Sequence, residues 1–296
     1  MNFVDQIESE IKSLKIQGAT NVALTVLQAL TQALDESPDI NSELLKQIGT
    51  RLAYVRPTEP LAQNAVRYIF GDLKSDKETI RGRVALYKSL IEDSKKEIAK
   101  VGSKLIHDGA AYVTHCHAST VTNALLTAKN EGKVIHVIST ETRPLMQGRR
   151  TAQELLDGGL QDVTMIVDSA AATTLANKQK PVEAVLVGAD LLSPTGFVNK
   201  IGTLGIIIIA QSYGIPVYCF STLLKFDPRP DVYDHIELRD PKEIWAEAPQ
   251  NLTIYSPAFD YTPYTEHITF ITEEGPIKGD SVKESALRRY PFIAKG

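Results

Sequence analysis

A cysteine between two histidines is the cluster in this sequence with the clearest capacity for chemistry. Cys116 follows the apolar run AAYVT and precedes Ser119 and Thr120, where the pattern changes to that of a helix. Unpaired N–H groups at a helix N-terminus stabilise a thiolate, and together with hydroxyl groups they bind phosphate. A lone cysteine is more often a small buried residue, and Cys219 in the apolar run PVYCF fits that description. The position of Cys116 instead predicts a site for a thiolate, an anion or both.

A second cluster follows the apolar run EAVLVG, where Asp190 comes after a glycine and an alanine. Such an acid can be a helix cap or a turn residue, but in a semi-closed cleft its pKa would be raised and it could act as a general acid and base. Asn199 and Lys200 then supply an amide and a cation just before a predicted helix, which suits a phosphate or a sugar hydroxyl. Further donors follow other predicted strands: Arg143, Gln147 and Lys225.

Other chemistries have less support. His115, Cys116 and His117 form one short cluster without the second pair that zinc sites usually have, so no metal is expected and the histidines are predicted to be structural or orienting. A cysteine-protease arrangement stays open, because it needs a distant histidine and an acid or amide that only the fold can bring together. The sequence has neither a Walker loop nor a G-x-G-x-x-G motif, the usual fingerprints of nucleoside triphosphatases and dinucleotide enzymes.

These candidate residues require a scaffold that brings strand ends together. From Asp108 onward, short β-rich runs alternate with helix-length segments, a pattern typical of a parallel sheet buried on both faces in a Rossmann-like α/β domain. Ligands of such sheets bind outside the carboxyl ends of the strands, so the polar clusters are expected to meet in one crevice. The expected strands are AAYVTH, VIHVIST, VTMIVD, EAVLVG and PVYCF, with LTIY as a later strand-like run.

The first 107 residues carry helical periodicity and almost no strand signal. Helical patterns cover residues 4–14, 22–34 and 44–55, and Ser75-Asp76 is expected to cap a helix that runs to about His107. Breaks at residues 17–20 and 56–58 are predicted to form a lid that brings backbone N–H groups and Arg56 to the cleft. We therefore predict a helical domain over residues 1–107 and a Rossmann-like domain over residues 108–296, with a C-terminal arm that packs across the domain or a neighbouring subunit.

Composition limits the classes of protein that remain. The chain has 296 residues, of which 43% are hydrophobic and 23% charged, and its net charge is −4. Neither the mean hydropathy of −0.12 nor the short apolar runs fit a membrane span, and the apolar content argues against disorder. Mild acidity gives no field that would attract nucleic acid. Two cysteines and an amphipathic, acid-containing N-terminus indicate a cytoplasmic protein rather than a secreted one.

Taken in order, several motifs are similar to those of one known family: THCHAST, STETRPLMQG, VDSAA, VGADLLSPTGFVNKIGT and LLKFDP. That family contains methylthioribose-1-phosphate isomerases, ribose-1,5-bisphosphate isomerases and the alpha, beta and delta subunits of translation initiation factor 2B. The similarity covers the α/β half and extends weakly to KIQGAT, RPTEPLAQNAVRYI and SPAFDYTP.

The resemblance implies an enzyme. The isomerases carry a cysteine after the first strand and an aspartate in the G-A-D segment, a pair that the initiation-factor subunits generally lack. Cys116 and Asp190 therefore favour an isomerase, and T-H-C-H, R-P-T and P-A-F-D-x-T-P are most similar to the archaeal ribose-1,5-bisphosphate isomerases. The implied roles are Asp190 as the acid that assists ring opening and Cys116 as the thiolate that removes the C2 proton, with ribulose 1,5-bisphosphate as product and no cofactor.

The resemblance and the predicted positions together give a set of expected binding residues and partners. The expected ligand is a phosphorylated pentose, and the chain is expected to form a homodimer through its α/β domains or a homohexamer. The expected substrate-binding residues are Gln17, Gly18, Ala19, Thr20, Arg56, Ala118, Ser119, Thr120, Arg143, Gln147, Asn199, Lys200 and Lys225.

The sequence also departs from the family pattern. Gln17 stands where the isomerases usually have an arginine, and Glu59-Pro60 replaces their usual Ala-Val after R-P-T. A glutamine does not reproduce the bidentate pairing of a guanidinium with phosphate. Two alternatives therefore stay open: an enzyme that acts on methylthioribose 1-phosphate or a similar sugar, and a non-catalytic regulatory subunit that resembles initiation factor 2B.

Overall fold

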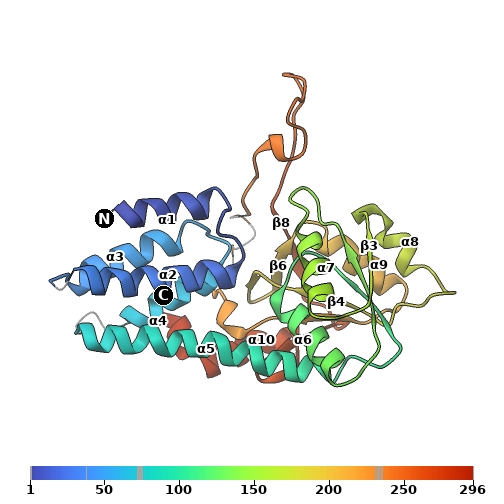
Figure 1. Cartoon of the computed structure of the whole chain (residues 1–296), viewed down its shortest axis with the longest axis horizontal. Helices are drawn as coiled ribbons and strands as arrows, with labels where there is room; N and C mark the ends of the chain where they lie inside the picture. Colours follow the sequence, from blue (N-terminus) through green and yellow to red (C-terminus); the bar gives the residue numbers. More distant parts are fainter. Residues whose placement is uncertain are drawn as a thin grey trace.

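Helices make up the N-terminal part of the computed structural model, which describes residues 2–37, 39–71, 76–229, 231, 234 and 236–295. Figure 1 shows these helices lying side by side, with the sheet half beyond them. Asp76 caps the longest helix by accepting a hydrogen bond from the Thr79 N–H at 2.7 Å; Ser75, the other predicted cap residue, lies outside the described residues. The helices are α1 (Asn2–Lys12), α2 (Ala19–Glu36), α3 (Ser42–Ala53), α4 (Pro60–Phe70) and α5 (Lys77–Ser103).

A mainly parallel, seven-stranded sheet follows, in the order β10-β9-β7-β4-β1-β2-β3. Strands β1, β2, β3, β4, β7 and β9 run parallel, and β10 is antiparallel to β9. The chain leaves β1 toward β2 and β3, then returns to add β4 on the other side of β1. The strands are β1 (Ala111–Thr114), β2 (His136–Thr140), β3 (Asp162–Ile166), β4 (Ala184–Gly188), β7 (Val217–Phe220), β9 (Ile268–Thr272) and β10 (Gly275–Lys278).

Alternation along each central strand divides its side chains between two cores. Tyr112 and Leu186 face one core, which they share with Ile98 of α5 and Val121 of α6 (Ser119–Asn130). Their neighbours, such as Val113, face the other core, which extends to the N-terminal helices and to α9 (Thr203–Ser212). Because both faces are covered, the central strands read as continuous apolar runs, as predicted. Two further helices accompany the sheet: α7 (Gln147–Asp157) and α8 (Ala171–Leu175).

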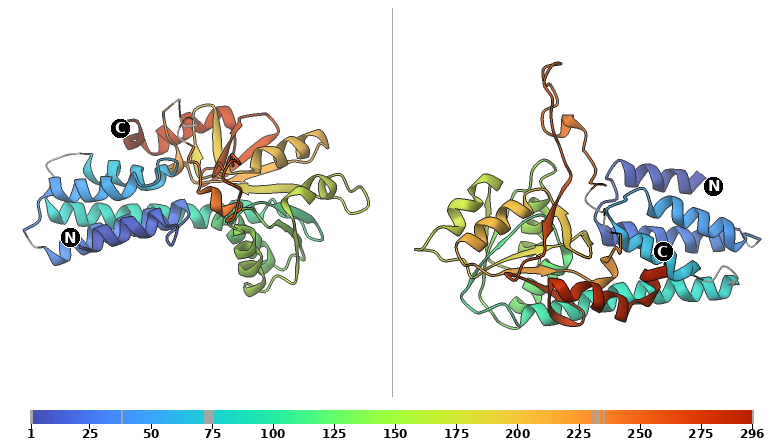
Figure 2. Two further views of the ribbon diagram at one scale, coloured as in Figure 1. Left: turned by 90° about the horizontal axis from the view of Figure 1, so that it is seen from above. Right: turned by 180° about the vertical axis from the view of Figure 1, so that it is seen from behind.

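The C-terminal residues return to the N-terminal helices. Helix α10 (Val282–Arg289) is followed by a 3₁₀ turn, Pro291–Lys295, that contacts α4 (Figure 2). There the Phe292 ring lies 5.0 Å from the Tyr68 ring and 6.2 Å from the Tyr87 ring, measured between centroids. The predicted boundary between residues 107 and 108 stays a prediction, because this contact and both cores connect the two halves of the chain.

A small antiparallel sheet lies beside the main one, in the order β5-β6-β8. Its strands are β5 (Leu191–Leu192), β6 (Gly196–Lys200) and β8 (Phe259–Pro263). Between Lys225 and β8 the chain forms a projecting arm, residues 239–256, drawn in orange in Figure 1. Its base is closed by hydrogen bonds from the Arg239 N–H to the Ser256 carbonyl and from the Ala258 N–H to the Glu237 carbonyl. None of the described helices combines the length and the apolar character needed to cross a bilayer.

Several sequence-based expectations about local structure were wrong. The run LTIY forms no strand; it lies in the arm, where Leu252 and Tyr255 are exposed. Strand β3 is not buried on both faces, because it lies at the sheet edge and leaves Met165 exposed. The longest helix ends at Ser103 rather than near His107. Helix α4 was not predicted as a separate element, and neither was the hairpin formed by the two-residue strand β5 and by β6.

The close packing of α5 on α6 gives a test of the fold. A methyl group at Gly102 of α5 would collide with the Phe220 ring and lie 2.9 Å from the Ala124 side chain. Gly102→Ala is therefore expected to lower the free energy of unfolding by about 1–3 kcal/mol. In the same helix, Gly82 is exposed and has open space around it, so Gly82→Ala is expected to raise that free energy by about 0.5–1 kcal/mol. Urea denaturation of both variants checks the prediction, and equal effects of the two substitutions would contradict it.

Candidate active site

A cavity of about 400 Å³ opens at the carboxyl ends of the central strands, between the sheet and the N-terminal helices. Cys116 follows β1 and Asp190 follows β4, and these two strands are hydrogen-bonded neighbours. The next strand after β1 lies on its opposite side, so the strand order reverses between β1 and β4. This reversal is the place where open α/β sheets bind their ligands.

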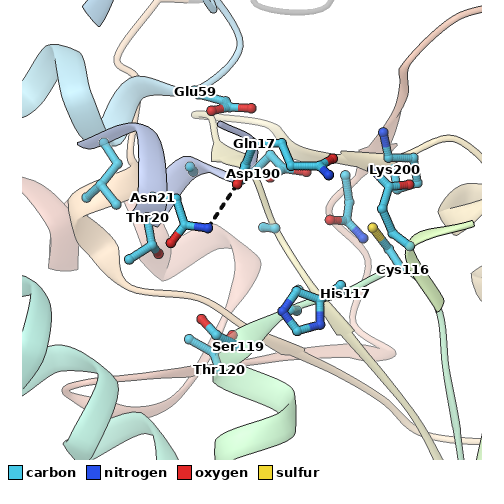
Figure 3. Close-up of a pocket in the computed structure, with 18 of the residues that line it drawn as sticks. Gln17, Thr20, Asn21, Glu59, Cys116, His117, Ser119, Thr120, Asp190 and Lys200 are labelled. Atoms are coloured by element: carbon cyan, nitrogen blue, oxygen red, sulfur yellow. Dashed lines mark hydrogen bonds between the residues drawn. The ribbon is translucent and has the colours of Figure 1, made fainter. Parts of the chain in front are cut away.

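Nearly all the residues that the sequence predicts to bind substrate line this one cavity. Figure 3 shows Cys116 and Lys200 close together, with Ser119 and Thr120 on a different side of the cavity from Glu59. The predicted residues that line it are Gln17, Gly18, Ala19, Thr20, Arg56, Cys116, Ala118, Ser119, Thr120, Gln147, Asp190, Asn199, Lys200 and Lys225.

Arg143 is the exception, because it is exposed and does not line the cavity. Its guanidinium donates to the Ile244 carbonyl in the arm at 3.3 Å, and its backbone N–H donates to Asp168 at 2.7 Å. The prediction failed because a residue can follow a strand directly and still be turned outward by its loop. Arg143 therefore contacts the arm instead of the cavity.

Cys116 adopts a left-handed backbone conformation, with φ of 68°, between the end of β1 and the start of α6. The Thr142 hydroxyl accepts a hydrogen bond from the Cys116 N–H at 2.9 Å, and the Cys116 carbonyl accepts one from the Thr151 hydroxyl at 2.8 Å. Burial raises the pKa of the thiol to about 11, partly offset by the positive charge of Lys200. The expected thiolate stabilisation by the helix N-terminus is thus outweighed by the burial of the thiol.

The two flanking histidines differ in their surroundings. His115 is buried, and its ring nitrogens contact the Thr140 hydroxyl at 2.7 Å and the Ile201 carbonyl at 2.9 Å. It therefore connects the end of β2 to the turn after β6. His117 lines the cavity, where its ring contacts Thr151 at 3.1 Å and Glu154 at 3.4 Å. Burial lowers the pKa of both rings, which favours the neutral form. Among the described residues, no group of His, Cys, Asp and Glu side chains is arranged to hold a metal ion.

Four helices begin at the cavity without a side-chain cap. The residues at their N-cap positions are Gly18 for α2, Glu59 for α4, Ala118 for α6 and Met146 for α7, and none accepts a capping hydrogen bond through its side chain. All four line the cavity. The first N–H groups of a helix have no partner within the helix, and together with the macrodipole they attract anions. This arrangement suits phosphate groups.

Glycine makes the close approach between β4 and α6 possible. A Cβ atom at Gly188 would lie 2.6 Å from the Ala118 side chain. Because this contact is shorter than any that side chains tolerate, a larger residue would push the start of α6 away from the strand that carries Asp190. The positions of the end of β4 and the start of α6, which carry the candidate chemistry, therefore depend on this glycine.

Lys200 lies at the end of β6, with its ammonium 4.6 Å from the centre of the Phe259 ring. Asn199 donates to the Thr203 hydroxyl at 3.0 Å. The turn that follows is held by Asp260, which accepts hydrogen bonds from the Gly202 and Leu204 N–H groups at 2.8 and 3.1 Å. Burial raises the pKa of Asp260 to about 6. The motif SPAFDYTP contains Asp260, but the sequence alone gave it no role.

Arg56 belongs to a buried cluster of charges at one side of the cavity. Its guanidinium contacts Glu237 through Nη2 at 2.9 Å and through Nε at 3.1 Å, and it contacts Glu59 at 3.2 Å. Burial raises the pKa of Glu59 to about 7, and the nearby Arg56 partly offsets this effect. Sequence reasoning did not predict Glu237 as a lining residue, because the acid-rich run around it carries no periodic signal.

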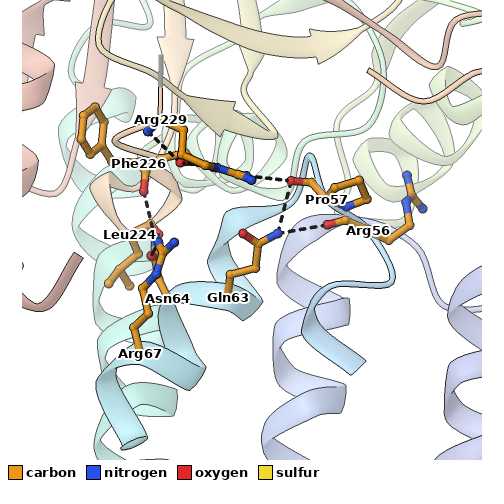
Figure 4. A network of polar contacts seen from close by, with 9 residues as sticks. Arg56, Pro57, Gln63, Asn64, Arg67, Leu224, Phe226 and Arg229 are labelled. Atoms are coloured by element: carbon orange, nitrogen blue, oxygen red, sulfur yellow. Dashed lines mark hydrogen bonds and ion pairs between the residues drawn. The ribbon is translucent and has the colours of Figure 1, made fainter. Parts of the chain in front are cut away.

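Helix α4 positions two of the cationic loops. Asn64 donates to the carbonyls of Leu224 and Phe226 at 2.8 and 2.9 Å, and Gln63 donates to the carbonyl of Pro57 at 3.2 Å (Figure 4). Lys225 lies between the two residues that Asn64 holds, and its ammonium donates to the Ala189 carbonyl at 2.6 Å. The loops that carry Arg56 and Lys225 are therefore fixed to one helix and thus to each other.

The raised pKa of Cys116 predicts slow alkylation of its thiol. At pH 8 the thiolate fraction of a thiol with a pKa of about 11 is small, so iodoacetamide is expected to modify Cys116 roughly 100-fold more slowly than free cysteine. The rate should keep rising up to at least pH 10. Lys200→Gln should slow the reaction further, because Lys200 lowers the pKa of the thiol. Mass spectrometry of a Cys219→Ala background, which leaves one thiol, measures these rates; a rate that levels off below pH 9 would contradict the assignment.

Comparison with known proteins shows relatives that match nearly the whole chain. The chain is 34% identical to a ribose 1,5-bisphosphate isomerase of Methanocaldococcus jannaschii, and the match covers 94% of this chain and 92% of the relative. It is 33% identical to a methylthioribose-1-phosphate isomerase of Geobacillus thermodenitrificans, over 95% of this chain and 86% of that protein.

Solved structures of related proteins have the same fold as this chain. A translation initiation factor eIF-2B from Pyrococcus horikoshii superposes with a TM-score of 0.81 at 26% identity, over 94% of this chain and 98% of that one. A 5-methylthioribose 1-phosphate isomerase from the same organism has the same fold, with a TM-score of 0.76 at 22% identity, over 97% and 88% of the two chains. The model of the initiation factor 2 subunit family matches residues 15–279. This protein is a member of the initiation factor 2 subunit family.

Proposed function

We propose that this protein is an aldose–ketose isomerase that converts ribose 1,5-bisphosphate to ribulose 1,5-bisphosphate. The observation that carries the proposal is the pairing of Cys116 and Asp190 in one cavity at the reversal of strand order. Relatives named as ribose 1,5-bisphosphate isomerases, at 34–35% identity over at least 92% of this chain, support the choice of substrate.

The proposed chemistry is a pair of proton transfers. In a sugar 1-phosphate the anomeric oxygen carries the phosphate, so the ring cannot open to a free aldehyde. Asp190 gives a proton to the ring oxygen as its bond to C1 breaks, and the Cys116 thiolate takes the proton from C2. The Cys116 thiol returns that proton to C1 of the resulting enol phosphate, while Asp190 recovers the proton of the C2 hydroxyl as the ketone forms. Atoms and electrons balance without a cofactor, and each such transfer contributes about 10²–10⁴-fold to the rate.

Local positive charges allow an anionic substrate to bind in the cavity, although the net charge of the protein is −4. Cations from six separate segments line the cavity, namely Arg56, Lys95, Arg150, Lys200, Lys225 and Arg239. The uncapped starts of α2, α6 and α7 add partial positive charge, and Ser119 offers a hydroxyl at one of them. These groups are suited to a substrate with phosphate at one end or at both.

A second candidate substrate is a pentose 1-phosphate without a phosphate at C5. Gln17 brings no charge to its side of the cavity, and the charge of Arg56 is shared by the carboxylates of Glu59 and Glu237. Relatives named as methylthioribose-1-phosphate and 5-deoxyribose 1-phosphate isomerases, at 33–34% identity, fit this alternative. Parallel assays with ribose 1,5-bisphosphate and methylthioribose 1-phosphate decide between the two.

The activity itself is tested with purified protein and ribose 1,5-bisphosphate, with formation of ribulose 1,5-bisphosphate followed by coupled carboxylation. Cys116→Ser and Asp190→Asn are each expected to lower kcat at least about 100-fold, because each removes one proton-transfer group. Cys219→Ser, which changes a buried thiol in β7 away from the cavity, should retain the activity. The kcat of the wild type at saturating substrate should rise with pH above neutrality, because Cys116 must lose its proton. Full activity in Cys116→Ser, or tight substrate binding without turnover, would reject the proposal; the second result would favour a regulatory subunit.

We also propose that the chain functions in the cytoplasm as a homodimer or homohexamer. Apolar side chains exposed on the projecting arm, among them Ile244, Trp245 and Tyr255, support self-association. Light scattering after gel filtration is expected to give two or six times the chain mass of 32.5 kDa. Trp245→Asp should shift the protein toward smaller species, because a charge would be buried in the contact. A monomer at micromolar concentration would contradict the proposal.

A further inference from the structure

We propose that Glu59 is an internal competitor that pairs with the Arg56 guanidinium and must release it when an anionic group of the ligand binds there. This inference rests on the proposed function for the assignment of Arg56 to an anionic ligand group. It adds a residue that controls access to Arg56, and it fixes the chemical class of the group that binds there as a phosphate-like oxyanion.

The side chain of Glu59 does not cap the helix that begins after it. It is the N-cap residue of α4, where an acidic side chain would normally accept hydrogen bonds from the first turn of the helix. Glu59 makes no such bond. Its carboxylate is instead turned toward Arg56 and the cavity, with Oε1 3.2 Å from the guanidinium and Oε2 buried without a hydrogen-bond partner.

Arg56 is also incompletely satisfied. Glu237 takes the Nε and Nη2 side of the guanidinium, Glu59 adds a second contact to Nη2, and Nη1 is buried without a partner. A phosphate group binds an arginine best through two parallel hydrogen bonds, and the Nη1–Nη2 side is the one still available for that geometry. Since Glu59 already lies on Nη2, its carboxylate and a bound oxyanion would compete for the same donor.

Electrostatics makes this competition depend on pH. The charged groups that act on Glu59 come from each element around it: Arg56 before α4, Asp190 after β4, Lys225 after β7 and Glu237 at the base of the arm. Arg239 pairs with Glu237 from the same segment at 3.4 Å. A dianion placed against Arg56 would lie beside this group of carboxylates, so its binding is easier when Glu59 takes up a proton. With the pKa of Glu59 at about 7, that uptake occurs near neutral pH.

The test uses sulfate, whose charge stays at −2 between pH 6 and 9. In the wild type, sulfate affinity is expected to fall about tenfold between pH 6 and pH 8, because the competent protonated form becomes scarce above the pKa. Glu59→Gln should show little pH dependence and bind sulfate several-fold more tightly at pH 8. Glu243→Gln, which removes a carboxylate that pairs with Arg239 but does not contact Arg56, should keep the wild-type dependence.

Calorimetry of the wild type gives a readout that needs neither a variant nor turnover. Titrations in two buffers of different ionisation enthalpy should show uptake of nearly one proton per sulfate at pH 8 and much less at pH 6. Identical pH dependence in the wild type and Glu59→Gln, or no proton uptake at pH 8, would overturn the inference. Because sulfate binding is measured directly, a lack of isomerase activity would reject the proposed function without deciding the role of Glu59.

Discussion

The parallel pairing of β1 with β4 is the contact on which the candidate site depends. It joins Tyr112 to Ala184 and Thr114 to Leu186, with both strands buried on both faces. Because β2 lies on the other side of β1, the loops after β1 and β4 diverge and leave a crevice between them. Cys116 and Asp190 reach that crevice directly from the two strand ends. The small residue at Gly188 then lets α6 start beside the same strand, so one pair of strands sets the position of the thiol, the carboxyl and a helix N-terminus.

The N-terminal helices complete the cavity and add to its positive charge. Helix α2 contributes an uncapped N-terminus, while α4 holds the loops of Arg56 and Lys225 through Gln63 and Asn64. The return of the C-terminal residues to α4, where Phe292 packs on Tyr68, adds a further contact that stabilises that helix. Cations from several elements therefore converge on a cavity in an otherwise acidic chain. Their fields are balanced by buried carboxylates, and this balance, more than the number of cations, determines where an anion can bind.

Burial has opposite consequences for two groups in this cavity. It raises the pKa of Cys116 and so holds the thiol in its protonated form, and it raises the pKa of Glu59 and so allows a carboxylate to become neutral near physiological pH. Exclusion of water therefore leaves little of the base in its thiolate form before substrate binds, while it also reduces the repulsion that a phosphate would meet. Lys200 lowers the pKa of the thiol, which makes it the residue that links anion binding to proton transfer in the proposed mechanism.

The sequence by itself determined the alternation of central strands with helices, and it placed Cys116 and Asp190 directly after two of those strands. All but one of the residues that it predicted to bind substrate line the cavity. These features are local: apolar runs set buried strands, and polar residues directly after them share one sheet edge. Only the tertiary structure decided that Arg143 turns outward, that LTIY belongs to an exposed arm, and that β3 lies at the edge of the sheet. It also decided the pairing of Arg56 with Glu59 and Glu237, which are separated by up to 181 residues. A sequence pattern records the neighbours of a residue along the chain, whereas charge pairing and pKa depend on the groups that folding brings into contact.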